Sequence, residues 1–249
     1  MLKINNSVES AEIYITGDII DDTDGAAVSA WDLGDGYEWP SDIRQQLDAV
    51  KGKPLTVYIN SDGGSVPAGV AIANMISRHD APTKAVIDGW CCSIATQIFF
   101  AAQAREMPEN AYLMIHKPWT IARGDADEMM RAASYLETVQ AGLETTYAKA
   151  AKDGVTPERI HELVNAETWL TGKDAAELFD IEVKDAAPVV NCIGGRAADS
   201  LKPPTGIVIN KTAKVETPEP TFDEKAENHI NKMRAKAKAA LAMKGAILS

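Results

Sequence analysis

Leu55-Thr-Val-Tyr-Ile-Asn-Ser-Asp-Gly-Gly64 decides the fold of this 249-residue chain, because a β-rich run breaks here at two glycines and a helical pattern follows. Leu55 to Ile59 is rich in β-branched and aromatic residues, which predicts a fully buried strand. Segment 66–78 then carries Val70 and Ile76 among small residues, which is typical of a helix. Repeated strand–turn–helix units of this kind indicate an α/β fold with a mostly parallel inner sheet.

The unit recurs on both sides of this stretch. Ile13 to Gly17 predicts a strand that ends in a glycine turn. Thr83 to Asp88 predicts another strand, and a third, around Tyr112 to Ile115, breaks at His116-Lys-Pro118. The other predicted elements are a turn at Gly89-Trp90, helices over 42–49 (capped by Ser41), 93–104, 124–152, 157–164 and 172–179, and a surface insertion over 21–40.

Charge divides the chain into an acidic body and a basic tail. The net charge is -11, which argues against nucleic acid as a partner. Residues 1–195 hold 15 basic and 30 acidic side chains, whereas residues 196–249 hold 10 and 6. Together with the proline-rich composition after Val190, this predicts a folded domain over 1–190, a flexible linker over 191–221 and a basic amphipathic helix over 222–249.

The sequence gives no sign of secretion, membrane insertion or a cofactor. Its first residues lack an apolar signal segment, and no apolar run approaches the roughly 18–20 residues that span a bilayer. Three cysteines cannot all pair, so we expect a reduced, cytoplasmic protein without a membrane partner. The chain has neither metal-ligand spacing nor a nucleotide-binding glycine pattern, so we expect no metal and no cofactor.

Three residue groups carry the chemistry that acyl transfer needs. Ser93 lies in an apolar segment, His116 ends a strand, and Gly63-Gly64 offers free backbone N–H groups. Each group alone has a simpler interpretation, as a helix N-cap, an edge histidine and a tight turn. If Ser93 and His116 meet in space, the chain is a serine hydrolase.

The order of these motifs resembles the Clp protease proteolytic subunit family. Tyr58-Ile-Asn-Ser-Asp-Gly-Gly64 is similar to the family's Tyr-Ile-Asn-Ser-Pro-Gly-Gly. Gly89-Trp-Cys-Cys-Ser-Ile-Ala95 is similar to Gly-x-Ala-Ala-Ser-Met-Gly, and Met114-Ile-His-Lys-Pro118 to Met-Ile-His-Gln-Pro. The resemblance covers roughly residues 10–185. It implies the ClpP/crotonase-type spiral of ββα units, with the long helix over 124–152 as its handle.

The resemblance also implies roles for individual residues. Ser93 is expected to be the nucleophile and His116 the general base, with the amides of Gly64 and Ile94 as the oxyanion hole. Glu167 stands where the family has an aspartate, two residues before an aromatic residue. Asp174 and Asp180 are less attractive third members, and a plainly solvated Glu167 is the remaining alternative. Cys91 and Cys92 flank the serine and are expected to pack as small hydrophobes rather than act as nucleophiles.

The implied function is a self-compartmentalised serine endopeptidase that cleaves polypeptides through an acyl-enzyme. The resemblance implies homo-oligomeric rings, heptamers or stacked pairs of them, built through the helix over 124–152. The segment 21–40 and the basic tail are not typical of the family and point to its phage and prophage branch of head-maturation proteases. The expected partners are therefore phage scaffold or capsid proteins or an AAA+ ATPase. Two alternatives are a crotonase-like acyl-CoA enzyme and an inactive structural protein that drives assembly.

Overall fold

The computed structural model describes residues 4–6, 9–32 and 36–186. Within them one mixed sheet runs in the order β1-β2-β4-β5-β6-β9, with β3 beside β2 and β7 between β5 and β8. The strands are β1 (Ile4–Asn6), β2 (Ala11–Ile19), β3 (Tyr37–Glu38), β4 (Leu55–Gly64), β5 (Thr83–Cys92), β6 (Ala104–Pro108), β7 (Tyr112–Ile115), β8 (Thr168–Thr171) and β9 (Glu182–Lys184). The helices are α1 (Asp22–Trp31), α2 (Pro40–Ala49), α3 (Val66–Ser77), α4 (Ala95–Ala101), α5 (Ala126–Ala150), α6 (Pro157–Asn165) and α7 (Gly172–Leu178).

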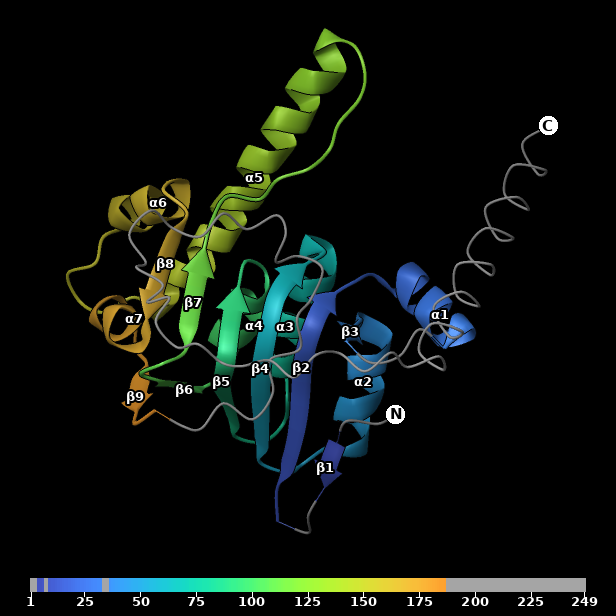
Figure 1. The fold of residues 1–249 in the computed structure, drawn as a ribbon, viewed down its shortest axis with the longest axis vertical. Coiled ribbons are helices and arrows are strands. Elements are labelled where there is room, and N and C mark those ends of the chain that lie inside the picture. Colours follow the sequence, from blue (N-terminus) through green and yellow to red (C-terminus); the bar gives the residue numbers. More distant parts are fainter. Residues whose placement is uncertain (1–3, 7–8, 33–35, 187–249) are drawn as a thin grey trace, which may run out of the picture. The chain divides into compact units, whose positions relative to one another are not determined.

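The central strands β2, β4 and β5 are parallel, as the strand–turn–helix units predict. Helices α3 and α4 lie behind them in Figure 1, and α2 lies beside β2. Alternate side chains of the strands, such as Ile15, Ile59 and Ile87, are fully buried against the core. The strand at 55–59 is therefore buried on one face only, and the prediction that it is fully buried is wrong. On its other face Tyr58 stacks on Tyr14 at 5.1 Å between ring centroids.

Several predicted boundaries differ from the structure. The prediction of a turn at Gly89-Trp90 is wrong, because β5 continues to Cys92 and pairs there with β7. The helix predicted from residue 93 begins at Ala95. Ser41 does not cap α2, which begins one residue earlier with Pro40 at its first position. Residues 21–40 hold a helix, α1, as well as loop.

Helix α5 confirms the predicted long helix and projects beyond the sheet (Figure 1). Asp125 starts it with a capping box, in which its side chain accepts from the Glu128 N–H and Glu128 bonds back to the Asp125 N–H. Only its C-terminal half is anchored, through the buried residues Leu143, Tyr147 and Ala150. The N-terminal half therefore presents most of its side chains to the surroundings.

The linker predicted over 191–221 and the helix predicted over 222–249 lie outside the described residues. In the part of the chain that is described, no helix is both long enough and apolar enough to cross a bilayer.

Candidate active site

Ser93 lies in the sharp turn between β5 and α4. Its backbone has φ +55°, in the left-handed region that residues with a Cβ rarely adopt. The Ser93 N–H donates to the Met114 carbonyl at 2.9 Å, and the Ser93 carbonyl accepts from the Thr96 N–H at 3.1 Å. The hydroxyl is thus presented by a fixed, strained turn rather than by the first turn of a helix.

The partner of Ser93 is His116, which directly follows β7. Strands β5 and β7 are parallel neighbours, and Cys92 pairs with Met114. This register brings the two strand ends together, and His116 Nε2 lies 2.7 Å from Ser93 Oγ. The structure therefore brings together the two residues that the sequence analysis named as nucleophile and base.

Two hydrogen-bonding contacts of Thr96 hold the turn at Ser93 in place. Thr96 Oγ1 donates to the Ser93 carbonyl, and the Tyr147 hydroxyl of α5 lies 2.6 Å from Thr96 Oγ1. Thr96 and Tyr147 are both buried, and burial raises the pKa of Tyr147 to about 12. The anchored half of α5 thus supports the turn that carries Ser93. The sequence analysis missed both residues, because their role depends on packing between distant elements.

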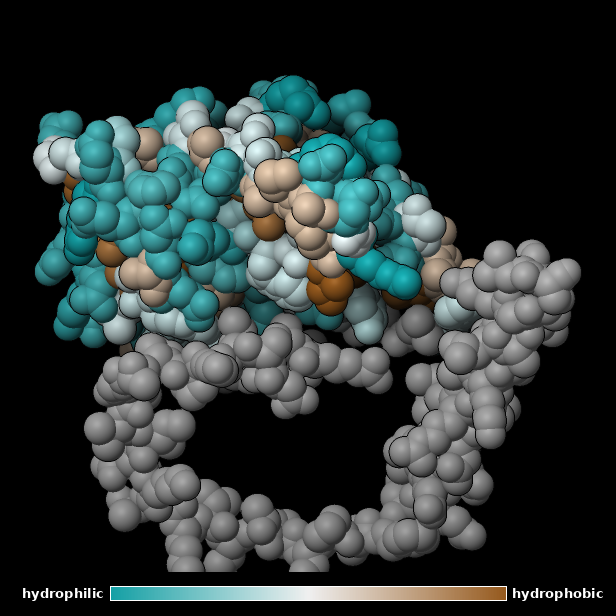
Figure 2. Space-filling model, turned by 90° about the horizontal axis from the view of Figure 1, so that it is seen from above, coloured by the Kyte–Doolittle hydropathy of each residue, from teal (hydrophilic) through white to brown (hydrophobic). Residues whose placement is uncertain are grey.

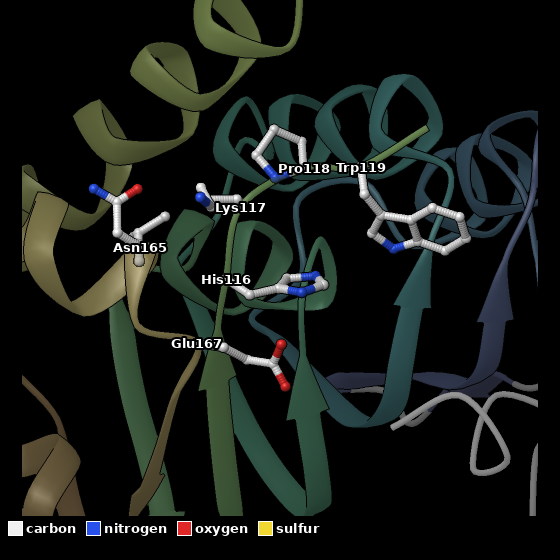
Figure 3. Close-up of a pocket in the computed structure, with 7 residues that line it drawn as sticks. His116, Lys117, Pro118, Trp119, Asn165 and Glu167 are labelled. Carbon is white, nitrogen blue, oxygen red and sulfur yellow. The ribbon is translucent and has the colours of Figure 1, made fainter. Parts of the chain in front are cut away.

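Glu167 lies on the other side of His116. It precedes β8, whose antiparallel pairing of Thr168 with Ile115 sets Glu167 opposite His116. Figure 3 shows its carboxylate extended toward the ring of His116. Burial lowers the pKa of His116, and the charge of Glu167 acts in the opposite direction. No hydrogen bond between the two is found in the described part of the chain, and Glu167 is exposed, with φ +52°.

The double glycine at the end of β4 packs against the same turn. Gly63 has φ +101°, and a Cβ there would lie 2.8 Å from Ser93 Cβ and from the Cys92 carbonyl oxygen. A side chain at Gly64 would meet the Ile19 carbonyl oxygen at 2.1 Å. Neither position tolerates a side chain. The sequence analysis chose Gly64 for the oxyanion hole and missed that, of the two glycines, Gly63 is the one that packs against Ser93.

Two cavities meet at His116. One, of about 500 Å³, is lined by Ser93, Gly63 and Gly64, by Asp18 and Asp62, and by the segment 118–121. The other, of about 460 Å³, lies on the side of Glu167 and Asn165 and is drawn in Figure 3. The first cavity brings Ser93 together with Gly63 and Gly64, and acyl transfer requires a nucleophile beside backbone amides.

The neighbouring cysteines are poor candidates for a nucleophile. Cys91 and Cys92 are both completely buried, and burial raises the pKa of each thiol. A buried thiol with a raised pKa holds little thiolate and reacts slowly. Their environment agrees with the packing role expected from the sequence.

Comparison with known proteins shows to which family this chain belongs. A model of the Clp protease family matches residues 42–178. ATP-dependent Clp protease proteolytic subunit 2 of Treponema denticola is 31% identical over 138 residues, which cover 54% of this chain and 66% of that protein. The subunit of Streptococcus pneumoniae is 30% identical over 129 residues, which cover 50% of this chain and 65% of that protein. The chain thus spans about two thirds of the length of these curated relatives.

A solved structure agrees at the level of the fold. A ClpP1 variant from Listeria monocytogenes superposes with a TM-score of 0.56 at 23% identity, over 70% of this chain and 91% of that one. The fold of this chain therefore has a counterpart of known structure. Because the family model covers more than half of the sequence, this chain belongs to the Clp protease family.

Proposed function

We propose that the protein is a serine endopeptidase of the Clp type, with Ser93 as nucleophile and His116 as general base. The observation that carries the proposal is the 2.7 Å contact between Ser93 Oγ and His116 Nε2 inside a cavity. Burial lowers the pKa of His116, so the ring is neutral at pH 7 and free to accept the serine proton. The serine oxygen then attacks a peptide carbonyl, and the imidazolium returns the proton to the leaving amine.

The amides beside the turn supply the oxyanion site in this mechanism. We assign it to the N–H groups of Gly64 and Ile94, which belong to the two backbone segments in contact at Ser93. The contact at Gly63 supports this assignment, since a Cβ there would lie 3.2 Å from the Ile94 nitrogen. Glu167 acts as the third member by stabilising the imidazolium through its charge.

We further propose that the protein works as a homo-oligomeric ring with α5 at the contacts between subunits. The projecting part of this helix exposes Met130 at 61% and Tyr135 at 56%, more apolar surface than a lone subunit would leave open. Figure 2 views the molecule from the end toward which α5 projects, and brown apolar surface lies there between teal hydrophilic side chains. The heptameric ring number rests on the family resemblance alone.

The substrate class that we propose is unfolded polypeptide, with phage scaffold or capsid proteins as the specific case. The basic sequence over 196–249 supports this case, because it lies beyond the residues 42–178 that match the family model and is one of the two features that point to the phage branch. An AAA+ ATPase partner and a cytoplasmic location follow from the family and belong to the same proposal.

Labelling with a neutral fluorophosphonate tests the proposal. The full chain should be modified on the peptide that contains Ser93, and Ser93→Ala should abolish both labelling and hydrolysis of casein, about a 10⁶-fold loss. Ser77→Ala, at an exposed serine on α3, serves as the matched control and should label normally. Absence of labelling in the native protein would favour the alternative of an inactive assembly protein. Intact-mass measurement after incubation would also report trimming of the tail.

A further inference from the structure

Two aspartates line the cavity that holds Ser93 and His116. Asp18 lies near the end of β2, and Asp62 precedes Gly63 on β4. In the parallel register Asp18 pairs with Gly63, so the two carboxylates come from neighbouring positions on adjacent strands. Asp62 also stands where the family motif has proline.

These carboxylates have no compensating charge within the described residues. Neither the Asp18 nor the Asp62 side chain makes an ion pair or a hydrogen bond there, and the residues lining this cavity include no lysine or arginine. Lys117 lines the other cavity. Burial raises the pKa of both aspartates, and the charge of Asp18 raises that of Asp62 further. The cleft thus holds negative charge that is partly desolvated and unpaired.

The same cavity also has large apolar side chains in its lining. Trp119 and Ile121 line the same cavity and are 70% and 90% exposed. Lysine and arginine combine a long apolar stem with a cationic head, and an indole face binds such a cation favourably. The cavity therefore offers both surfaces that a basic side chain uses.

We propose that Asp18 and Asp62 form an acidic subsite that binds a lysine or arginine side chain of the polypeptide next to the scissile bond. This inference rests on the proposed function, because it concerns the substrate of that same site. A bound cation has a second effect. The negative charge of the two aspartates disfavours the oxyanion of the tetrahedral intermediate. A substrate cation bound between the aspartates and the oxyanion offsets that repulsion.

The test uses peptide pairs that carry lysine or norleucine at one position, scanned from three residues before to two residues after the cleaved bond. The native full-length protein should prefer lysine at one position by about tenfold or more in kcat/KM, as expected for a hydrogen bond to a charged group. Asp62→Asn should remove most of this preference. It should also raise kcat/KM for the norleucine peptide, because the repulsion of the oxyanion is relieved.

Asp88→Asn is the matched control. Asp88, on β5, is also an aspartate with a raised pKa, but it is more exposed and does not line the cavity. It should leave the preference unchanged. Equal rates on lysine and norleucine peptides at every position, or an unchanged preference in Asp62→Asn with native thermal stability, would overturn the inference. Fluorophosphonate labelling of Ser93 in the same samples separates this outcome from failure of the proposed function, in which the native protein neither labels nor cleaves either peptide.

Discussion

The left-handed backbone of Ser93 predicts that glycine fits this position better than alanine. With φ at +55°, a residue that has a Cβ is destabilised by about 1–2 kcal/mol, whereas glycine is not. Ser93→Gly and Ser93→Ala both remove the hydroxyl and its 2.7 Å contact with His116. The difference in stability between the two variants therefore isolates the effect of the Cβ.

The expected difference is small but measurable. Glycine also lowers the stability of the variant by about 0.5–1 kcal/mol, because the unfolded chain with glycine has more conformations to lose on folding. Ser93→Gly should therefore be more stable than Ser93→Ala by roughly 0.5–1 kcal/mol. For a domain of this size that corresponds to a Tm higher by about 1–4 °C.

Differential scanning calorimetry at one protein concentration measures this difference, with assembly held constant between variants. The control pair is Ser29→Gly and Ser29→Ala, at an exposed position inside α1. There alanine should be the more stable variant by about 1 kcal/mol, since the backbone is helical. If Ser93→Gly melts at or below Ser93→Ala while the control pair behaves as expected, the strained-turn reasoning is refuted.

Two further outcomes follow from the structure, and a third follows from the sequence. Glu167→Gln should lower the rate of hydrolysis, by up to about 10⁴-fold if the carboxylate orients the His116 ring. Because the charge of Glu167 raises the pKa of His116, its removal should also move the acid limb of the pH–rate profile to lower pH. An unshifted acid limb would mean that another group acts on the ring. Met130→Glu should weaken the ring, since it adds charge to exposed apolar surface on α5; an unchanged mass by light scattering at micromolar concentration would exclude this surface from the contacts. Limited proteolysis should leave a stable core that ends near residues 190–200, and a tail as resistant as the body would require a second domain instead of the linker predicted over 191–221.

The sequence alone determined the series of central strand–turn–helix units and named Ser93 and His116 as the candidate reactive pair. Strand–turn–helix units could be predicted because the hydrophobic pattern is local, and α3, β7 and α5 lie close to their predicted bounds. The family follows from three short motifs in the right order. Ser93 and His116 could be named because their motifs occur together and in the order of the family, although each motif alone has a simpler interpretation.

Only the tertiary structure decided how those residues meet. Strand β5 runs through Gly89-Trp90 to Cys92 because β7 pairs with it there, and no local signal predicts that pairing. The same pairing sets Ser93 against His116, and the pairing of β7 with β8 places Glu167 opposite them. The close approach of Gly63 to Ser93 arises from the register of β4 and β5, and the convergence of Asp18 with Asp62 arises from the register of β2 and β4. Register depends on contacts between residues far apart in the chain, so it cannot be predicted from any single stretch of sequence.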